Sequence, residues 1–352
     1  MATSVSLAPR SRRVVASCPR RGIYSALNEE RPFVRQRRVR GARGVARLMR
    51  LCRFGDDRLG IVEGGRVTDI TAALDVLPAC RYPFPTHDVL IASLAKIVAR
   101  AQEVLPGAPA VPLADVGLLS PVANPGKIIA APVNYQKHLD EVKDDSQIHA
   151  GNPAHTVTIQ NAGLFLKATS SLAGAGEGIA LVKPDRRTDH EVELVVVIGR
   201  SARHVARADA LRYVAGYCIG LDVSIRGSED RSFRKSPDSY SVLGPWLVTA
   251  DDIPDPGVLD LQISVNGVLR QKSNTRHLIL GVPELIELAS SFYTLHPGDV
   301  IFTGTPEGVS PIQPGDEVSA SIERIGTMDV RVRAAEEEPG VPAMSASTGA
   351  GP

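Results

Sequence analysis

The sequence has few cysteines, few aromatic residues and no long apolar run. Its four cysteines show no Cys-x-x-Cys spacing, which argues against a disulfide framework or a zinc site and fits a reducing compartment. No apolar run approaches the roughly 20 residues of a membrane-spanning helix. Aromatic residues make up 4% of the chain, whereas 31 Gly and 26 Pro are present, a balance typical of turns and short strands. We therefore expect a cytoplasmic, strand-rich protein without a membrane partner.

The first 48 residues contain twelve arginines, no lysine and only two acids, Glu29 and Glu30. Their net charge is 12 − 2 = +10, so residues 49–352 carry +1 − 10 = −9. Such a segment is typical of an organellar transit peptide or of an arm that binds nucleic acid. Because the acidic remainder offers no basic surface to continue such an arm, no nucleic-acid partner is expected. We favour a disordered leader, or one outside the native chain, since Met49 opens the first strand-like run.

Composition divides the remaining chain into three parts. Residues 49–120 are expected to form a small β/α domain, an antiparallel meander with Gly-Asp and Gly-Gly turns followed by a helix within 86–104. A Pro- and Gly-rich stretch then leads to Pro121, where a larger domain of residues 121–334 should begin. The tail, residues 335–352, is acidic and then rich in Gly, Ala, Ser and Pro, which is typical of disorder.

The larger domain is expected to consist mainly of short strands. Residues 142–163 are polar and show no clear period, and so long a loop beside chemistry is often a lid. The patterns predict strands at 127–131, 191–198, 217–225 and 300–302, a hairpin at 261–271 around Asn266-Gly267, and a helix at 283–292.

Three acidic side chains lie within two of these strands. Glu191 and Glu193 are two residues apart and therefore project from one face, and Asp222 shares a face with Gly220, which leaves room for a close approach. Buried neighbouring carboxylates repel each other unless a cation lies between them. Oxygen ligands favour Mg²⁺ or Mn²⁺, with Ca²⁺ also possible. The alternative is a solvated strand face whose acids pair with Lys or Arg.

Two further patterns carry chemistry. His138 and Glu141 are three residues apart, so one helical turn brings them together, and the carboxylate would raise the basicity of the imidazole for activating water. The alternative is an ordinary surface pair. Residues 303–308, Thr-Gly-Thr-Pro-Glu-Gly, follow a strand, and their glycines let backbone amides approach an anion. The alternative is that these residues only form an ordinary turn at the end of the strand.

The order of these motifs resembles the fumarylacetoacetate hydrolase family from about Pro121 to Val332. Each motif is weak alone, but the ordered set is highly specific. The resemblance implies an α+β, β-rich fold, a mixed β-sandwich roll with a small N-terminal domain, usually dimeric, with Mg²⁺ or Mn²⁺ in its mouth. The motifs are Asn-Tyr-x-x-His-x-x-Glu at 134–141, Leu-Phe-Leu-Lys at 164–167, His-Glu-Val-Glu-Leu at 190–194, Gly-Tyr with Asp222 and Arg226, Lys-Ser at 235–236, Leu-Gly-Pro at 243–245, Val-Asn-Gly at 265–267, Pro-Gly-Asp-Val-Ile at 297–301 and Thr-Gly-Thr-Pro-x-Gly at 303–308.

The resemblance also implies a role for nine side chains. Three would bind the metal, two would activate water, and the others would contact a small keto-acid substrate. These are Glu191, Glu193 and Asp222 as metal ligands; His138 and Glu141 as the water-activating pair; Arg226, Lys235 and Thr305 at the carboxylate or keto oxygens; and Lys167, in a matching motif, on the substrate side.

The activity we expect is hydrolysis of a C–C bond in an acylpyruvate-like or fumarylpyruvate-like diketo acid, through an enolate that the metal stabilises. Decarboxylation of a 2-keto acid such as oxaloacetate, or isomerisation or hydration of ring-cleavage products of aromatic catabolism, could use the same metal. A non-catalytic metal binder is a further alternative. The sequence departs from the family at Glu229, where many members carry Gln in the segment after the metal-binding Asp, and this puts the usual substrate contact there in doubt.

Overall fold

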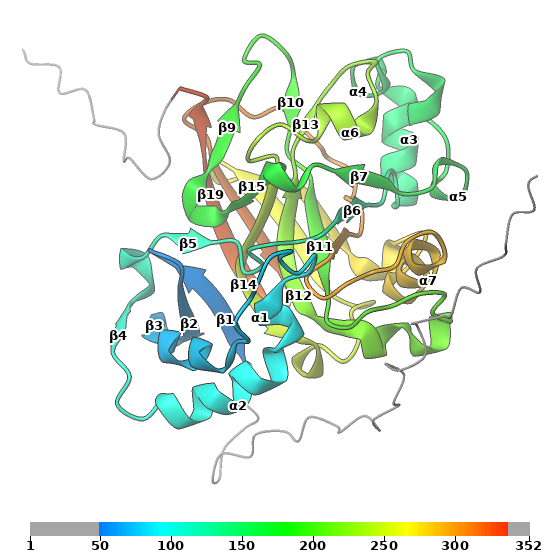
Figure 1. Cartoon of the computed structure of the whole chain (residues 1–352). Helices are drawn as coiled ribbons and strands as arrows, with labels where there is room; N and C mark the ends of the chain where they lie inside the picture. The colour runs from blue at the N-terminus through cyan, green and yellow to red at the C-terminus, as the bar shows by residue number, and fades with distance from the viewer. Residues whose placement is uncertain (1–48, 337–352) are drawn as a thin grey trace, which may run out of the picture. The chain divides into compact units, whose positions relative to one another are not determined.

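The computed structural model describes residues 49–336, which form a strand-rich α+β fold (Figure 1). A 12-stranded sheet dominates it, beside a five-stranded sheet and a two-stranded ribbon. The large sheet runs β4 (Ala110–Pro112), β3 (Arg66–Asp69), β2 (Arg58–Glu63), β1 (Arg50–Phe54), β14 (Ser241–Thr249), β12 (Val214–Asp222), β11 (Val192–Ile198), β17 (Val300–Phe302), β6 (Ile128–Ala130), β7 (Phe165–Lys167), with β5 (Leu118–Leu119) on β1 and β8 (Leu172–Gly174) on β14. The five-stranded sheet runs β16 (Val268–Asn274), β15 (Asp260–Val265), β18 (Glu317–Ile322), β19 (Gly326–Ala334), β9 (Ile179–Leu181), and the ribbon pairs β10 (Thr188–Asp189) with β13 (Ser224–Ile225).

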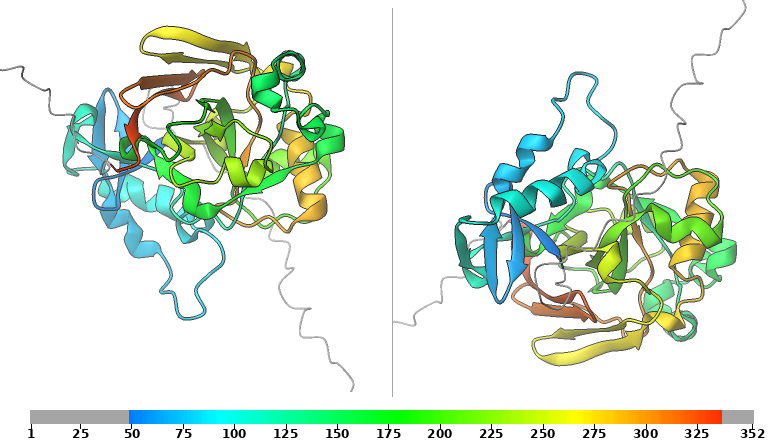
Figure 2. Two further views of the ribbon diagram at one scale, coloured as in Figure 1. Left: turned by 90° about the horizontal axis from the view of Figure 1, so that it is seen from above. Right: turned by 90° about the horizontal axis from the view of Figure 1, so that it is seen from below.

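The two faces of the large sheet bury separate cores. Val192, Leu194 and Val196 on β11 pack in one cluster with side chains of the five-stranded sheet, such as Ile263 and Val330. The opposite face packs against α1 (Val89–Ala92) and α2 (Leu94–Val104). Both views of Figure 2 place the yellow hairpin of β15 and β16 and the blue-to-cyan N-terminal helices on opposite sides. The large sheet is therefore covered on both faces, which explains why its central strands β11 and β12 are mostly apolar, with Glu193 and Asp222 as exceptions.

The N-terminal meander and helix form as predicted. Strands β1, β2 and β3 pair in antiparallel order, and the helix is broken at Ser93 into α1 and α2. It begins at Val89 because the Asp88 side chain caps it, accepting a hydrogen bond from the Ile91 amide at 2.9 Å. Since β1 also pairs with β14, the large sheet runs across the expected boundary near residue 120. The division into two domains there stays a prediction.

The segment expected to be an irregular loop contains several short helices instead. These are α3 (Gln136–Asp144), α4 (Ser146–His149), a 3-10 turn (Pro153–His155) and α5 (Ile159–Ala162). Val142 and Ile148 are buried together with Val309, so the segment has a small apolar core of its own. Short helices with few apolar positions leave too little periodicity to be seen in a sequence.

The remaining predicted elements match the structure closely. The hairpin turns at Asn266 and Gly267, whose φ angles of 51° and 76° are those of a type I′ turn. Helix α7 (Val282–Phe292) carries a proline at its start, as expected. Cys52, Cys80 and Cys218 form no disulfide. The leader, residues 1–48, and the tail from residue 337 lie outside the described residues.

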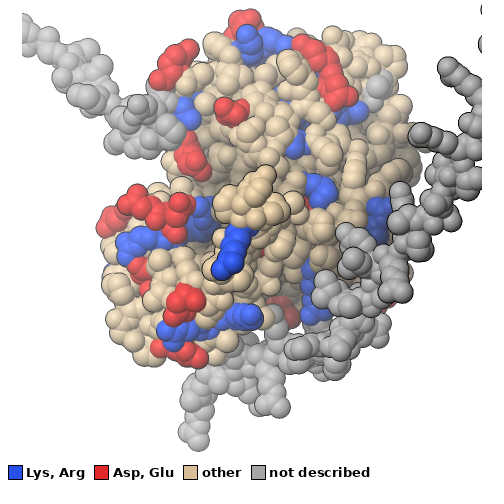
Figure 3. Space-filling model, viewed as in Figure 1, with Lys and Arg blue, Asp and Glu red and all other residues tan. Residues whose placement is uncertain are grey.

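Within residues 49–336, no helix is long and apolar enough to cross a membrane. On the face shown in Figure 3, the blue basic and red acidic side chains are interspersed. Charge on that face is therefore not gathered into one patch.

Candidate active site

The three predicted metal ligands meet where β11 and β12 lie side by side. Glu193 is opposite Gly220 in the antiparallel register, and the Asp222 amide donates to the Glu191 carbonyl at 3.0 Å. This pairing places all three acids at one end of the same sheet face. Each is at most 4% exposed, and one carboxylate oxygen from each lies within 4.8 Å of the others. The alternative is therefore wrong about solvation, although its pairing of the acids with Lys and Arg is observed.

Basic side chains offset part of this charge. The Lys235 ammonium donates to Glu191 Oε2 at 2.7 Å and to Asp222 Oδ2 at 2.6 Å, and Arg226 Nη2 donates to Glu191 Oε1 at 2.9 Å. Lys167, which is buried, pairs with the other Asp222 oxygen and with the Tyr240 carbonyl. The Lys235 ammonium is therefore shared by the Glu191 and Asp222 carboxylates.

Glu193 shows how well the site suits a divalent cation. Burial raises its pKa well above the usual range, and repulsion from Asp222 raises it further. By contrast, neighbouring Lys235 and Arg226 outweigh burial and lower the pKa of Glu191. Basic side chains pair with Glu191 and Asp222, whereas Glu193 accepts a hydrogen bond from the Gly304 amide. A cation beside Glu193 would offset its buried charge, and oxygen ligands suit a hard cation. Glu191, Glu193 and Asp222 therefore fit Mg²⁺ or Mn²⁺.

The predicted water-activating pair forms on α3. His138 Nδ1 lies 2.7 Å from Glu141 Oε2, and the imidazole is 4% exposed. The Gly308 amide donates to the other Glu141 oxygen at 2.9 Å. Glu141 is thus held by two groups, and it orients the imidazole with Nδ1 toward the carboxylate. The alternative of an ordinary surface pair is wrong, because His138 is buried.

The glycine-containing turn after β17 holds carboxylates of the protein itself. The amide of Gly304, whose φ is 99°, donates to Glu193 Oε2 at 2.5 Å. The Thr305 hydroxyl donates to the Val192 carbonyl at 2.9 Å and accepts from Gln271 Nε2 at 2.9 Å. Its single proton is therefore already used. A contact from this hydroxyl to a substrate carboxylate would have to replace the bond to Val192.

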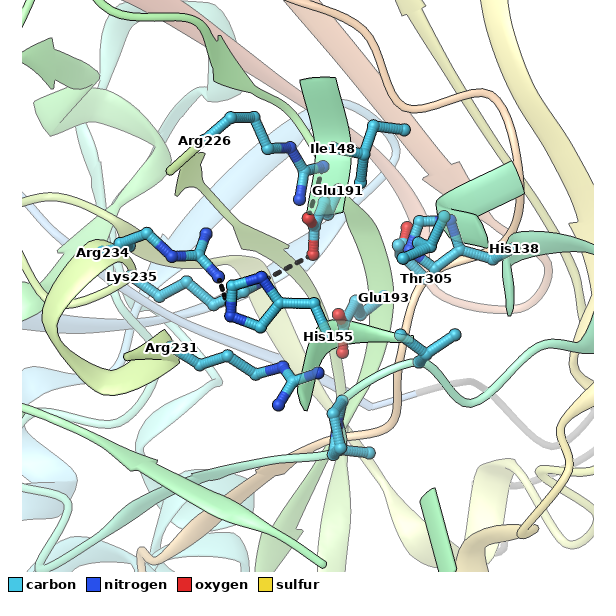
Figure 4. Close-up of a pocket in the computed structure, with 14 residues that line it drawn as sticks. His138, Ile148, His155, Glu191, Glu193, Arg226, Arg231, Arg234, Lys235 and Thr305 are labelled. Carbon is cyan, nitrogen blue, oxygen red and sulfur yellow. Dashed lines mark hydrogen bonds and ion pairs between the residues drawn. The ribbon is translucent and has the colours of Figure 1, made fainter. Parts of the chain in front are cut away.

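One pocket brings most of the predicted residues together (Figure 4). Lys167, Asp222 and Glu141 do not line it, and Lys167 donates to the Asp222 carboxylate. The pocket wall also contains three side chains that the sequence analysis missed, His155, Arg231 and Arg234. The two arginines are three residues apart, and this spacing could have indicated that they lie on one side of a helical turn. Nothing near His155 in the sequence indicated the site. The predicted residues in the wall are His138, Glu191, Glu193, Arg226, Lys235 and Thr305.

Two unusual positions near the site have structural explanations. Glu229 forms a double ion pair with Arg186, at 2.8 and 2.9 Å, and does not line the pocket. The space at Gly220 is filled by the protein, since a Cβ there would collide with Val195 and Phe302. The close approach expected at Gly220 is therefore made by Val195 and Phe302 of the protein itself.

Comparison with known proteins agrees with this geometry. Residues 127–333 match the model of the fumarylacetoacetate hydrolase C-terminal domain, which is more than half of the chain. The chain belongs to the fumarylacetoacetate hydrolase family. It is 61% identical to maleylpyruvate hydrolase of Aquipseudomonas alcaligenes over 285 residues, 81% of this chain and 99% of that protein. It is 34% identical to the mitochondrial oxaloacetate tautomerase of Rattus norvegicus over 277 residues, 75% of this chain and 83% of that protein.

A solved structure extends the comparison to the fold. Maleylpyruvate hydrolase from Sphingobium sp. SYK-6, crystallised with manganese(II) and pyruvate, superimposes with a TM-score of 0.69 at 42% identity. The match covers 82% of this chain and 100% of that one. These findings confirm the predicted family, the sheet-rich fold, the hydrolase activity and the divalent-metal cofactor.

Proposed function

We propose that this enzyme hydrolyses an acylpyruvate of the maleylpyruvate type, releasing a carboxylic acid and pyruvate. The observation that carries the proposal is the shared pocket, whose wall contains both the His138 imidazole and the carboxylates of Glu191 and Glu193. The relatives named maleylpyruvate hydrolase support the choice of substrate. Glu191, Glu193 and Asp222 would hold Mg²⁺ or Mn²⁺.

In this mechanism His138 takes a proton from water through Nε2, while its Nδ1–H stays on the ring and donates a hydrogen bond to Glu141 Oε2, 2.7 Å away. The water oxygen bonds to the acyl carbonyl carbon, the C–C bond breaks, and its electron pair remains on the pyruvate part as an enolate. His138 then returns the proton to the enolate carbon. A bound divalent cation supplies Lewis-acid stabilisation of the negative charge on the keto-acid oxygens. Arg226 and Lys235, which line the pocket, would hold the substrate's carboxylate.

The test is a substrate panel assayed with the purified enzyme and Mg²⁺ or Mn²⁺. We expect maleylpyruvate, fumarylpyruvate or acetylpyruvate to yield pyruvate and the matching acid, both identified by NMR. If oxaloacetate alone were consumed with loss of CO₂, decarboxylation would replace hydrolysis. If substrate rearranged with every carbon retained, the enzyme would be an isomerase or tautomerase. The cytoplasmic location, the homodimer, the disordered leader and the disordered tail also stay predictions.

A further inference from the structure

A run of charges of alternating sign leads away from the proposed metal ligand Glu191. Arg226 Nη2 donates to Glu191 Oε1 at 2.9 Å, and its Nε donates to Asp189 Oδ2 at 2.7 Å. The other oxygen of Asp189 accepts from Arg187 Nε at 2.9 Å. Arg187 Nη1 in turn donates to Asp145 Oδ2 at 3.2 Å. These contacts connect the acids beside β11 to the end of α3.

The middle of this run is fixed by burial and by the ribbon of β10 and β13. Asp189 is 0% exposed and both of its oxygens are paired, so displacing it would leave a buried charge without a partner. The Arg226 amide also donates to the Arg187 carbonyl at 2.8 Å. The backbone of Arg187 is therefore anchored beside the site, while its side chain, 22% exposed, reaches outward to Asp145.

The outer end of the run lies at the joint between α3 and α4 (Figure 1). Asp145 follows the last residue of α3 and caps α4, accepting from the Gln147 amide at 2.8 Å. Burial raises the pKa of Asp145, but the Gln147 amide and Arg187 outweigh burial and lower it. Arg187 also donates to Gln147 Oε1 at 3.0 Å. Its guanidinium therefore holds the end of α3 and the start of α4 together.

The helix held in this way carries His138 and Glu141. It has nine residues, and helices of this length are marginal in water, so contacts with the rest of the protein set its position. The Gly308 amide holds α3 through the Glu141 side chain, and Arg187 holds it one turn further along the chain. A small displacement of a catalytic group lowers the rate strongly, because the reacting atoms leave their productive geometry.

We propose that Arg187 is a positioning residue for the hydrolysis, which fixes α3 and its general base relative to the acids that would hold the metal. This inference rests on the proposed function. Arg187 does not line the pocket; it acts through Asp145 on α3 and through Asp189 on Arg226. Arginine suits this role because its rigid fork of N–H groups serves two carboxylates at once.

The decisive experiment separates kcat from KM in the Mg²⁺-loaded enzyme. Arg187→Met should lower kcat for maleylpyruvate about 10- to 10²-fold, because the base on α3 shifts. KM should change less than about 3-fold, since Arg226 keeps its bonds to Asp189 and Glu191. Arg187→Lys should recover part of kcat. Arg100→Met, which also removes an arginine paired with two acids but lies on α2 outside the pocket wall, is the matched control and should leave both constants unchanged.

A second variant tests the same contact from the other side. Asp145→Asn removes the charge but keeps an oxygen that can cap α4, so its main effect is on the pair with Arg187. It should also lower kcat, and adding it to Arg187→Met should cause little further loss. Losses that multiply as if the two sites were independent would overturn the inference.

Hydrogen exchange keeps the inference separate from the proposed function. Without metal or substrate, amides of residues 136–149 should exchange faster in Arg187→Met than in wild type, and at the wild-type rate in Arg100→Met. If wild type cleaved no acylpyruvate, the proposed function would fail, yet protection that depends on Arg187 would still support the hold on α3. Unchanged exchange in Arg187→Met, or faster exchange with unchanged kcat, would overturn the inference.

Discussion

The two faces of β11 and of the residue before it, Glu191, carry different kinds of side chain. One face is apolar, with Val192, Leu194 and Val196 in the core between the sheets. The other begins with Glu191 and Glu193 and turns apolar only at Val195. Both faces are equally buried, so burial alone does not decide which residues a strand carries. The acids are tolerated because cations and a backbone amide contact them, whereas the side chains of the opposite face pack in the apolar core.

The largest effect is expected from His138→Ala, which should lower kcat and leave the stability of the protein nearly unchanged. Loss of a positioned general base should lower kcat about 10²- to 10⁴-fold. The melting temperature should change little, because the imidazole's described hydrogen bond is made within its own helix. Steady-state kinetics and calorimetry measure the two effects. Unchanged kcat would exclude His138 as the base.

Leu194→Ala tests the apolar face. Removing this buried side chain should lower the free energy of unfolding by about 2–5 kcal/mol, since it leaves a cavity in the core. Denaturant unfolding gives the value, and Mg²⁺ affinity of the folded variant should match that of wild type. A variant that kept its stability but lost the metal would show that the two faces are coupled.

Compared with wild type, Glu193→Gln should be more stable without metal and less stable when Mg²⁺ is present. Without metal, the change relieves repulsion from Asp222 and should raise stability by about 1 kcal/mol, by analogy with other buried unpaired charges. With Mg²⁺ present, wild type should gain stability and the variant should gain much less, because a ligand is lost. Thermal unfolding across a Mg²⁺ titration distinguishes these cases. Equal stabilisation of both proteins would contradict the metal assignment.

The smallest effect is expected from Glu229→Gln, outside the pocket. The ion pair with Arg186 lowers the pKa of Glu229 to about 2, so its contribution is complete above pH 4.5 and is lost as pH falls toward 2. Because the pair is 30–39% exposed, we expect less than about 1 kcal/mol. Denaturant unfolding at pH 7 and pH 3 should show a smaller difference for the variant than for wild type. Activity at pH 7 should be unchanged.

Local patterns in the sequence determined much of the site. The period of two put Glu191 and Glu193 on one face, and the spacing of three brought His138 to Glu141, because these geometries depend only on the backbone of one element. The Asn266-Gly267 turn followed in the same way from the backbone angles that these residues tolerate.

Only the tertiary structure decided what surrounds these residues. The pairing of Glu229 with Arg186 spans 43 positions, and that of Lys167 with Asp222 spans 55. The packing of the short helices that follow β6 brings His155 to Arg234, 79 positions away. Such contacts depend on how elements pack rather than on any local period. The sequence by itself therefore determined the grouping of Glu191 with Glu193 and of His138 with Glu141, while the fold decided which side chains compensate their charges.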